Sequence, residues 1–209
     1  MISRTLAIVV SSASTGPLFA HPWWVNLLLL IPLVAFLRWR KQRIRLARGQ
    51  LLWLAAFALA FGFVESAVVV YLRAAIGLLP GYQGTLADVQ RASPDFYKQA
   101  EALKEFPSSL LTVEVCREAA TMIMLVSMTM LAAPKARERW AAFLWAFAIW
   151  DMSYYVGLFA TVRWPGSLSD LDVLFLIPVP WLAPVWFPVL VSCLTLIVVL
   201  ARVQNSASR

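Results

Sequence analysis

Long apolar segments dominate this chain and restrict what it can fold into. Several of them exceed the roughly 18 to 20 residues that cross the hydrocarbon core of a bilayer as a helix. Of the 209 residues, 61% are hydrophobic and only 14% are charged. The sequence therefore predicts a single all-α integral membrane domain over residues 1–209, built as a bundle of transmembrane helices. We expect these helices near residues 23–37, 51–78, 109–133, 140–162 and 173–201.

The N-terminal segment 1–20 leaves two alternatives open. Arg4 precedes the apolar stretch 6–10, and the small residue Ala20 follows a polar stretch. This pattern is typical of a signal peptide or of a short membrane anchor. As an anchor the segment would add a sixth helix to the bundle, whereas a signal peptide would be removed from the mature protein.

The helix expected over 173–201 cannot be regular. Proline has no backbone N–H and its ring clashes with the preceding turn, so it breaks or kinks a helix interior. Four prolines fall in the outer half of this segment: Pro178, Pro180, Pro184 and Pro188. We therefore expect a proline-broken last helix, with backbone carbonyls free for other partners, as in the broken helices that line cavities in transporters.

The loop 79–108, between the second and third helices, carries a helix of its own. Ser93 and Pro94 supply a cap and a first-turn proline, which together mark a helix start. In the following stretch 95–106, apolar residues fall on one stripe and charged residues lie elsewhere. We expect a short amphipathic helix over the outer end of the bundle.

Basic residues predict the orientation of the chain. The loops 38–48 and 135–139 are rich in lysine and arginine, and by the positive-inside rule both are cytoplasmic, together with the C-terminus. The start of the first helix then lies outside, as in a multi-pass protein of a bacterial-type inner membrane. The net charge of +7 follows from this asymmetry and does not indicate a nucleic-acid partner. The loop 38–48 is also a candidate contact for anionic lipids of the bilayer.

Ionisable residues within the predicted helices indicate a site. An unpaired charge at the bilayer centre costs about 3 kcal/mol on insertion scales, so such residues face a bundle interior and mark function. Counting the helical rise from each end brings acids of three helices to overlapping depths. Helical spacing adds two tyrosines to the acid of the fourth helix. The candidate site is Glu65, Glu114, Arg117, Glu118, Asp151, Tyr154 and Tyr155.

Charge balance constrains how such a site works. Arg117 alone cannot neutralise four carboxylates. Some of the acids are therefore protonated, or a cation occupies the site, or the two states alternate. The structural alternative is that Arg117 bridges one or two acids while the others are neutral and hydrogen-bonded. If a cation binds, its candidate ligands are Glu65, Glu118 and Asp151, whose oxygen atoms favour Mg²⁺, Ca²⁺ or Mn²⁺.

Several familiar chemistries lack their residues in this sequence. The chain has one histidine, His21, which lies outside the acidic cluster, so haem and zinc sites lack their usual ligands. The sequence contains no GxxxxGK[ST] or GxGxxG nucleotide-binding motif, and no HExxH or GxSxG hydrolase motif. Neither a haem nor a nucleotide cofactor is expected.

Three functions remain, and they belong to different classes. The favoured one is a proton- or cation-coupled transporter, in which the acids carry the ion and Glu114 with Arg117 forms an outer gate. The second is a membrane-embedded enzyme acting on a lipid or an externally presented substrate, with paired carboxylates as acid and base and Tyr155 or Arg117 stabilising negative charge. The third is a non-catalytic subunit or assembly factor of a membrane complex. Transport by so small a chain would require a homo-oligomer or a larger membrane complex.

Overall fold

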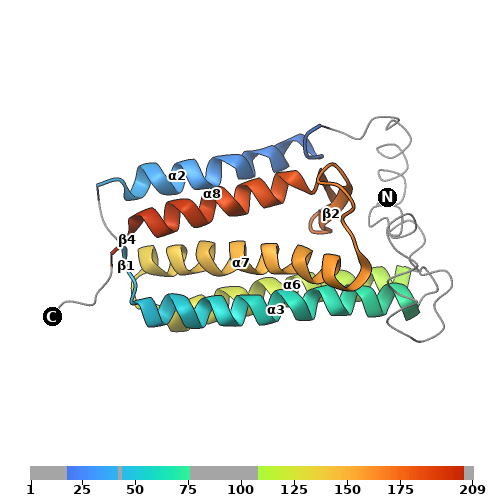
Figure 1. Cartoon of the computed structure of the whole chain (residues 1–209), viewed down its shortest axis with the longest axis horizontal. Helices are drawn as coiled ribbons and strands as arrows, with labels where there is room; N and C mark the ends of the chain where they lie inside the picture. The colour runs from blue at the N-terminus through green and yellow to red at the C-terminus, as the bar shows by residue number, and fades with distance from the viewer. Residues whose placement is uncertain (1–17, 42–43, 76–107, 205–209) are drawn as a thin grey trace.

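The computed structural model describes residues 18–41, 44–75 and 108–204 (Figure 1). Most of the signal or anchor segment 1–20 and all of the stretch 95–106 lie outside the described residues. The described part is a bundle of five α-helices, the first preceded by the 3₁₀ helix η1 (Trp23–Leu29). The α-helices are α2 (Leu30–Trp39), α3 (Arg48–Ala75), α6 (Ser108–Ala132), α7 (Ala136–Val162) and α8 (Trp186–Arg202).

Three of the helices are long and apolar enough to cross a membrane: Arg48–Leu72, Ser109–Ala132 and Ala136–Val162. The two other apolar segments, Trp23–Trp39 and Trp186–Arg202, are shorter. At 1.5 Å of rise per residue, the 17 residues of α8 extend about 26 Å, which is less than the roughly 30 Å of a hydrocarbon core. The predicted helical bundle is therefore confirmed, but the prediction of five membrane-spanning helices is wrong, because two of the five fall short of that length.

The chain before α8 forms a β-hairpin where a helix was expected. Its strands are β2 (Leu171–Phe175) and β3 (Trp181–Pro184), which pair antiparallel. Pro178 lies between the two strands, where no helical N–H is required. The expectation of irregular backbone here is confirmed. The helix expected over 173–201, however, begins only at Trp186, because the chain before it forms the hairpin.

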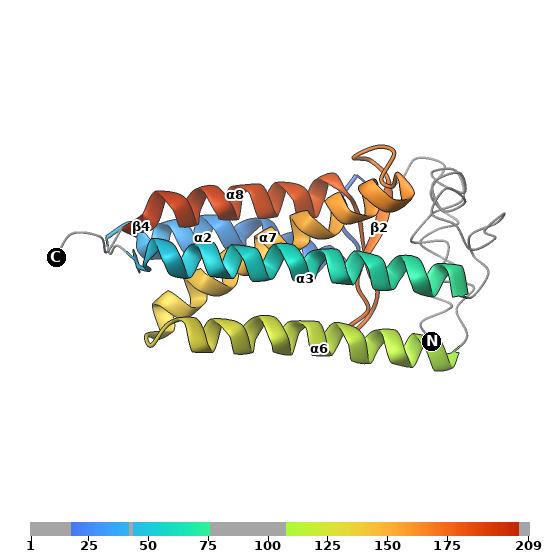
Figure 2. The ribbon, with the colours of Figure 1, turned by 60° about the horizontal axis from the view of Figure 1, so that its bottom comes forward.

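The hairpin closes one end of the bundle. The backbone of His21 pairs with that of Leu182 in β3 through two hydrogen bonds of 2.7 Å, which fixes the hairpin to the segment before η1. Leu176, just after β2, packs on Leu111 and Val115 of α6. Figure 2 shows the hairpin reaching across the bundle toward α6, from which α7 diverges after their connecting turn. The hairpin thus bridges helices on opposite sides of α7.

Helices α3 and α7 pack along their length with very little space between them. Gly62 of α3 lies against the backbone of α7, and Gly157 of α7 lies against Ser66 of α3. The Ser153 hydroxyl of α7 donates a hydrogen bond of 2.7 Å to the Leu59 carbonyl of α3. Close approach of this kind is typical of membrane helices that present small residues to each other. This pair forms the rigid centre of the bundle.

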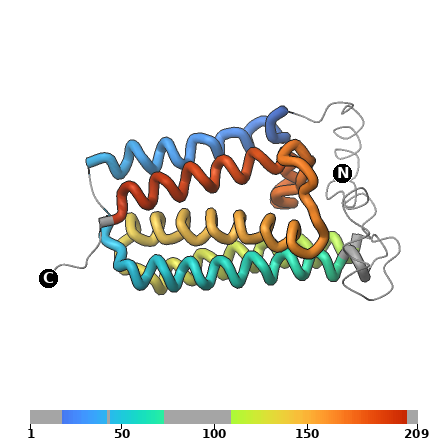
Figure 3. The backbone as a smooth tube through the Cα atoms, viewed as in Figure 1, coloured from blue at the N-terminus to red at the C-terminus, as the bar shows by residue number. Residues whose placement is uncertain are grey.

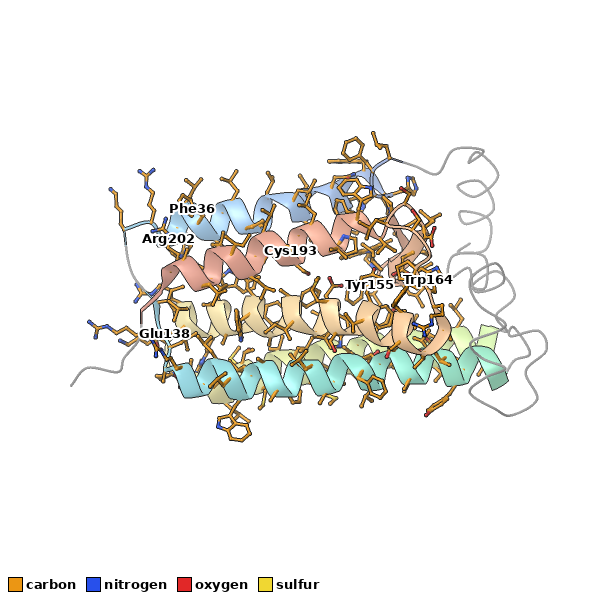
Figure 4. All side chains as sticks on the ribbon, viewed as in Figure 1. Phe36, Glu138, Tyr155, Trp164, Cys193 and Arg202 are labelled. Carbon is orange, nitrogen blue, oxygen red and sulfur yellow. The ribbon has the colours of Figure 1, made fainter. Side chains whose placement is uncertain are left out.

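Helices α2, α3, α7 and α8 come together at the end of the bundle opposite the hairpin (Figure 3). Apolar side chains from all four helices pack there. The short strands β1 (Ile44–Arg45) and β4 (Val203–Gln204) pair in parallel there. Arg202 lies over the ring of Phe36, 4.2 Å from its centroid, and ties α8 to α2 (Figure 4). Tyr155 and Trp164 lie at the other end, beside the hairpin (Figure 4). The candidate site is therefore at the hairpin end of the bundle.

Candidate functional site

A cavity of about 100 Å³ lies between α6, α7, the hairpin and the beginning of α8. We call it the carboxylate cavity. A space of this size holds a few water molecules or the polar end of a larger molecule. All of the residues selected from the sequence line it: Glu65, Glu114, Arg117, Glu118, Asp151, Tyr154 and Tyr155. The structure also adds lining residues that sequence reasoning did not place in the site: Trp150, Asp172, Trp181 and Ser192.

Arg117 links two of the acids. Its guanidinium forms an ion pair with Glu65 of α3 and a second, of 2.9 Å, with Glu114 of its own helix α6. The Thr121 hydroxyl donates a further hydrogen bond to Glu65. Both glutamates are buried. The structural alternative for this part of the cluster, in which Arg117 bridges one or two acids, is therefore confirmed.

Glu118 and Asp151 line the same cavity, and each is held there by a hydrogen bond. Glu118 is buried and accepts a hydrogen bond of 2.8 Å from the backbone N–H of Leu176, next to the hairpin strand β2. Asp151 accepts a hydrogen bond of 2.7 Å from the hydroxyl of Ser192 on α8. Neither carboxylate forms an ion pair with any residue that the structure describes. Each therefore keeps acceptor capacity for a ligand or a proton.

Asp172 is a further carboxylate of the site. It is only 1% exposed, and it accepts a hydrogen bond of 2.7 Å from the Tyr155 hydroxyl and one of 2.8 Å from the N–H of Val173. The helix expected over residues 173–201 left Asp172 just outside it, so the sequence did not place Asp172 in the site. The hairpin carries it into the cavity instead. The sequence carried one signal for this placement: Asp172 stands near the start of a strand, directly before a run of apolar residues.

Two tryptophans add donors to the same cavity. The indole nitrogens of Trp150 and Trp181 are buried, and neither has a hydrogen-bond partner among the described residues. A buried N–H without a partner costs about 1 to 3 kcal/mol, so native structures rarely leave one unexplained. An acceptor atom of a bound molecule would satisfy them. Both tryptophans line the cavity, so two N–H groups without a partner in the described part of the chain lie in the same wall as the carboxylates.

The hypothesis of a metal site gains no support from the geometry. Within the described ranges, no three side chains of histidine, cysteine, aspartate or glutamate gather closely enough to hold a metal ion. Glu65, one of the three proposed ligands, is held by Arg117 and Thr121. The two other proposed ligands, Glu118 and Asp151, have hydrogen-bond partners on different elements.

The fold and the cavity together define the class of protein. It is a small, mostly helical protein with three candidate membrane spans and buried carboxylates at one end of its bundle. No protein-family model matches the sequence, and comparisons with curated proteins and with solved structures give no match. The function must therefore be argued from the cavity itself.

Proposed function

We propose that the carboxylate cavity is the active site of a membrane-embedded enzyme that performs acid–base chemistry on a lipid or an externally presented substrate. The observation that carries the proposal is the pairing of two kinds of group in one cavity. Glu118 and Asp151 are carboxylates that form no ion pair among the described residues. Trp150 and Trp181 offer N–H donors that no described residue accepts. Such a combination suits a substrate that exchanges a proton and develops negative charge.

In this proposal the groups of the cavity have different roles. One of the two carboxylates, Glu118 or Asp151, takes a proton from the substrate, and the other returns one. The indole N–H groups of Trp150 and Trp181 stabilise negative charge that develops on a substrate oxygen atom. Arg117 is committed to Glu65 and Glu114, so it holds helices together and does not contact the substrate.

Tyr155 is a positioning residue in this proposal. Its hydroxyl donates to Asp172, and its ring lies 5.4 Å from that of Tyr154 and 6.1 Å from that of Trp164. The contact with Asp172 ties helix α7 to strand β2, which forms a wall of the cavity. The hydroxyl is thus occupied by a protein acceptor.

Proton-coupled transport is the second candidate, and one observation favours it. The carboxylates of Glu118, Asp151 and Asp172 line one cavity, as a proton relay requires. Two features that the transporter hypothesis expected differ in the structure, however. Glu65, expected to carry an ion, is paired with Arg117. The broken helix expected to coordinate the ion is a hairpin, whose Leu176 donates to Glu118. A sealed structural cluster, expected for a non-catalytic subunit, fits poorly with a cavity of about 100 Å³.

The test compares membrane extracts from cells that express the wild type, Asp151→Asn or Glu118→Gln. Mass spectrometry of lipids and of the medium is expected to show a substrate that falls and a product that rises with the wild type. Both variants should lower product formation about 100-fold or more, because each removes one partner of the proton transfer.

Glu138→Gln is the matched control. It also neutralises a buried glutamate of α7, but at the opposite end of the bundle (Figure 4). At equal protein levels it should leave the product unchanged. A product that forms equally with Asp151→Asn would refute the enzyme proposal, and a solute that accumulates across the membrane without chemical change would replace it with transport.

A further inference from the structure

A second pocket lies at the end of the bundle opposite the hairpin. Its volume is about 810 Å³, and it is formed by the end of α2 and the beginning of α7. Three basic side chains line it: Arg38 of α2, Lys41 just after that helix, and Arg137 of α7. Apolar and aromatic side chains complete the wall: Leu37, Trp39, Ala136 and Trp140. Cations that are far apart in the sequence thus converge on one concave surface.

The charges at the beginning of α7 favour an anion there. The N-terminus of a helix carries partial positive charge, so acidic residues stabilise it and basic residues do not. Helix α7 begins beside Lys135, whose side chain makes no capping hydrogen bond, and its first turn contains Arg137 and Arg139. Only Glu138 is acidic in that turn. An anion in the pocket would interact favourably with the helix dipole and with the basic residues at once.

We propose that this pocket binds the phosphate of an anionic phospholipid headgroup. Arg38, Lys41 and Arg137 supply the positive charge. The apolar wall distinguishes a lipid from soluble phosphate, because Trp140 is exposed and offers an amphipathic indole ring of the kind that is enriched at the membrane interface. The predicted orientation places this end at the cytoplasmic leaflet, whose lipids carry negative charge. This site is separate from the carboxylate cavity.

The experiment measures lipid binding to the purified, delipidated protein by native mass spectrometry. Phosphatidylglycerol is titrated against phosphatidylcholine with the same acyl chains, and inorganic phosphate is added as a competitor. The wild type should prefer phosphatidylglycerol. The double variant Arg38→Gln/Lys41→Gln should bind it about 30-fold less tightly, because each basic residue near the surface contributes about fivefold.

The matched control is Arg40→Gln/Arg45→Gln, which removes the same charge from exposed residues outside the pocket. It should change the affinity by less than about threefold, because exposed charges that do not contact the headgroup are screened by water and salt. The charge-preserving variant Arg38→Lys/Lys41→Arg should bind like the wild type. Equal losses in the control and pocket variants would overturn the proposal in favour of diffuse attraction. Equal binding of both lipids, or displacement of the lipid by equimolar inorganic phosphate, would also overturn it.

Discussion

Replacing Arg117 with methionine is expected to lower the free energy of unfolding by about 3 to 5 kcal/mol. The substitution removes the ion pairs to Glu65 and Glu114 and leaves both carboxylates buried without a cation. Removing one partner of a buried ion pair destabilises a protein more than replacing both partners by neutral groups, because the remaining charge is buried without water or a counter-ion. Unfolding by SDS in mixed micelles, followed by circular dichroism, measures the loss.

A triple variant separates charge from packing. Arg117→Met combined with Glu65→Gln and Glu114→Gln removes the whole charged group, and it should recover most of the lost stability. A triple variant as unstable as Arg117→Met alone would show that the side chain acts by filling space. If Arg117→Met alone were as stable as the wild type, that result would contradict the ion pairs of Arg117 with Glu65 and Glu114.

Gly62→Ala is expected to destabilise the protein by about 1 to 3 kcal/mol. A Cβ atom at Gly62 would lie 2.5 Å from the carbonyl oxygen of Trp150 and 2.8 Å from Cβ of Ser153, so α3 and α7 must move apart. Gly49→Ala is the matched control in the same helix, because no atom lies within 4 Å of the added carbon. It should be neutral or slightly stabilising, since alanine is the better helix former. The same unfolding assay measures both variants.

Equal stability of Gly62→Ala and Gly49→Ala would contradict the close packing of α3 on α7. A destabilised Gly62→Ala variant would also bear on the site, because Trp150 lies both at this contact and on the wall of the carboxylate cavity. Movement of α7 would shift the indole that the proposed mechanism uses. Loss of stability and loss of product formation should therefore appear together in this variant.

The parts of the fold that the sequence predicts well are those set by local composition. A long apolar run carries its own preference for a helix in lipid, so α3, α6 and α7 begin and end within about four residues of their predicted ends. The hairpin was missed for the same reason. Its residues are as apolar as those of a membrane helix. They are strands because they pair with each other and with His21, and these contacts cannot be read from local composition.

Most residues of the site could be predicted from the sequence, but the ion pairs and hydrogen bonds between them could not. Charged residues in apolar helices face inward, which places Glu65, Glu118 and Asp151 on one cavity without any tertiary information. The ion-pair partner of Arg117 on another helix depends on how α3 and α6 pack against each other. Likewise, Asp172 reaches the site only because the hairpin folds back onto the bundle.

The accessibility of Glu118 and Asp151 is the most direct test of the account, and it requires no knowledge of the substrate. Carbodiimides modify carboxyl groups that they can reach and that no cation holds in an ion pair. We predict that a membrane-soluble carbodiimide, followed by peptide mass spectrometry, modifies Glu118 and Asp151 and spares Glu65 and Glu114. Modification of the Arg117-paired acids alone, or of none of the four, would contradict the claim that this cavity is an open site of acid–base chemistry.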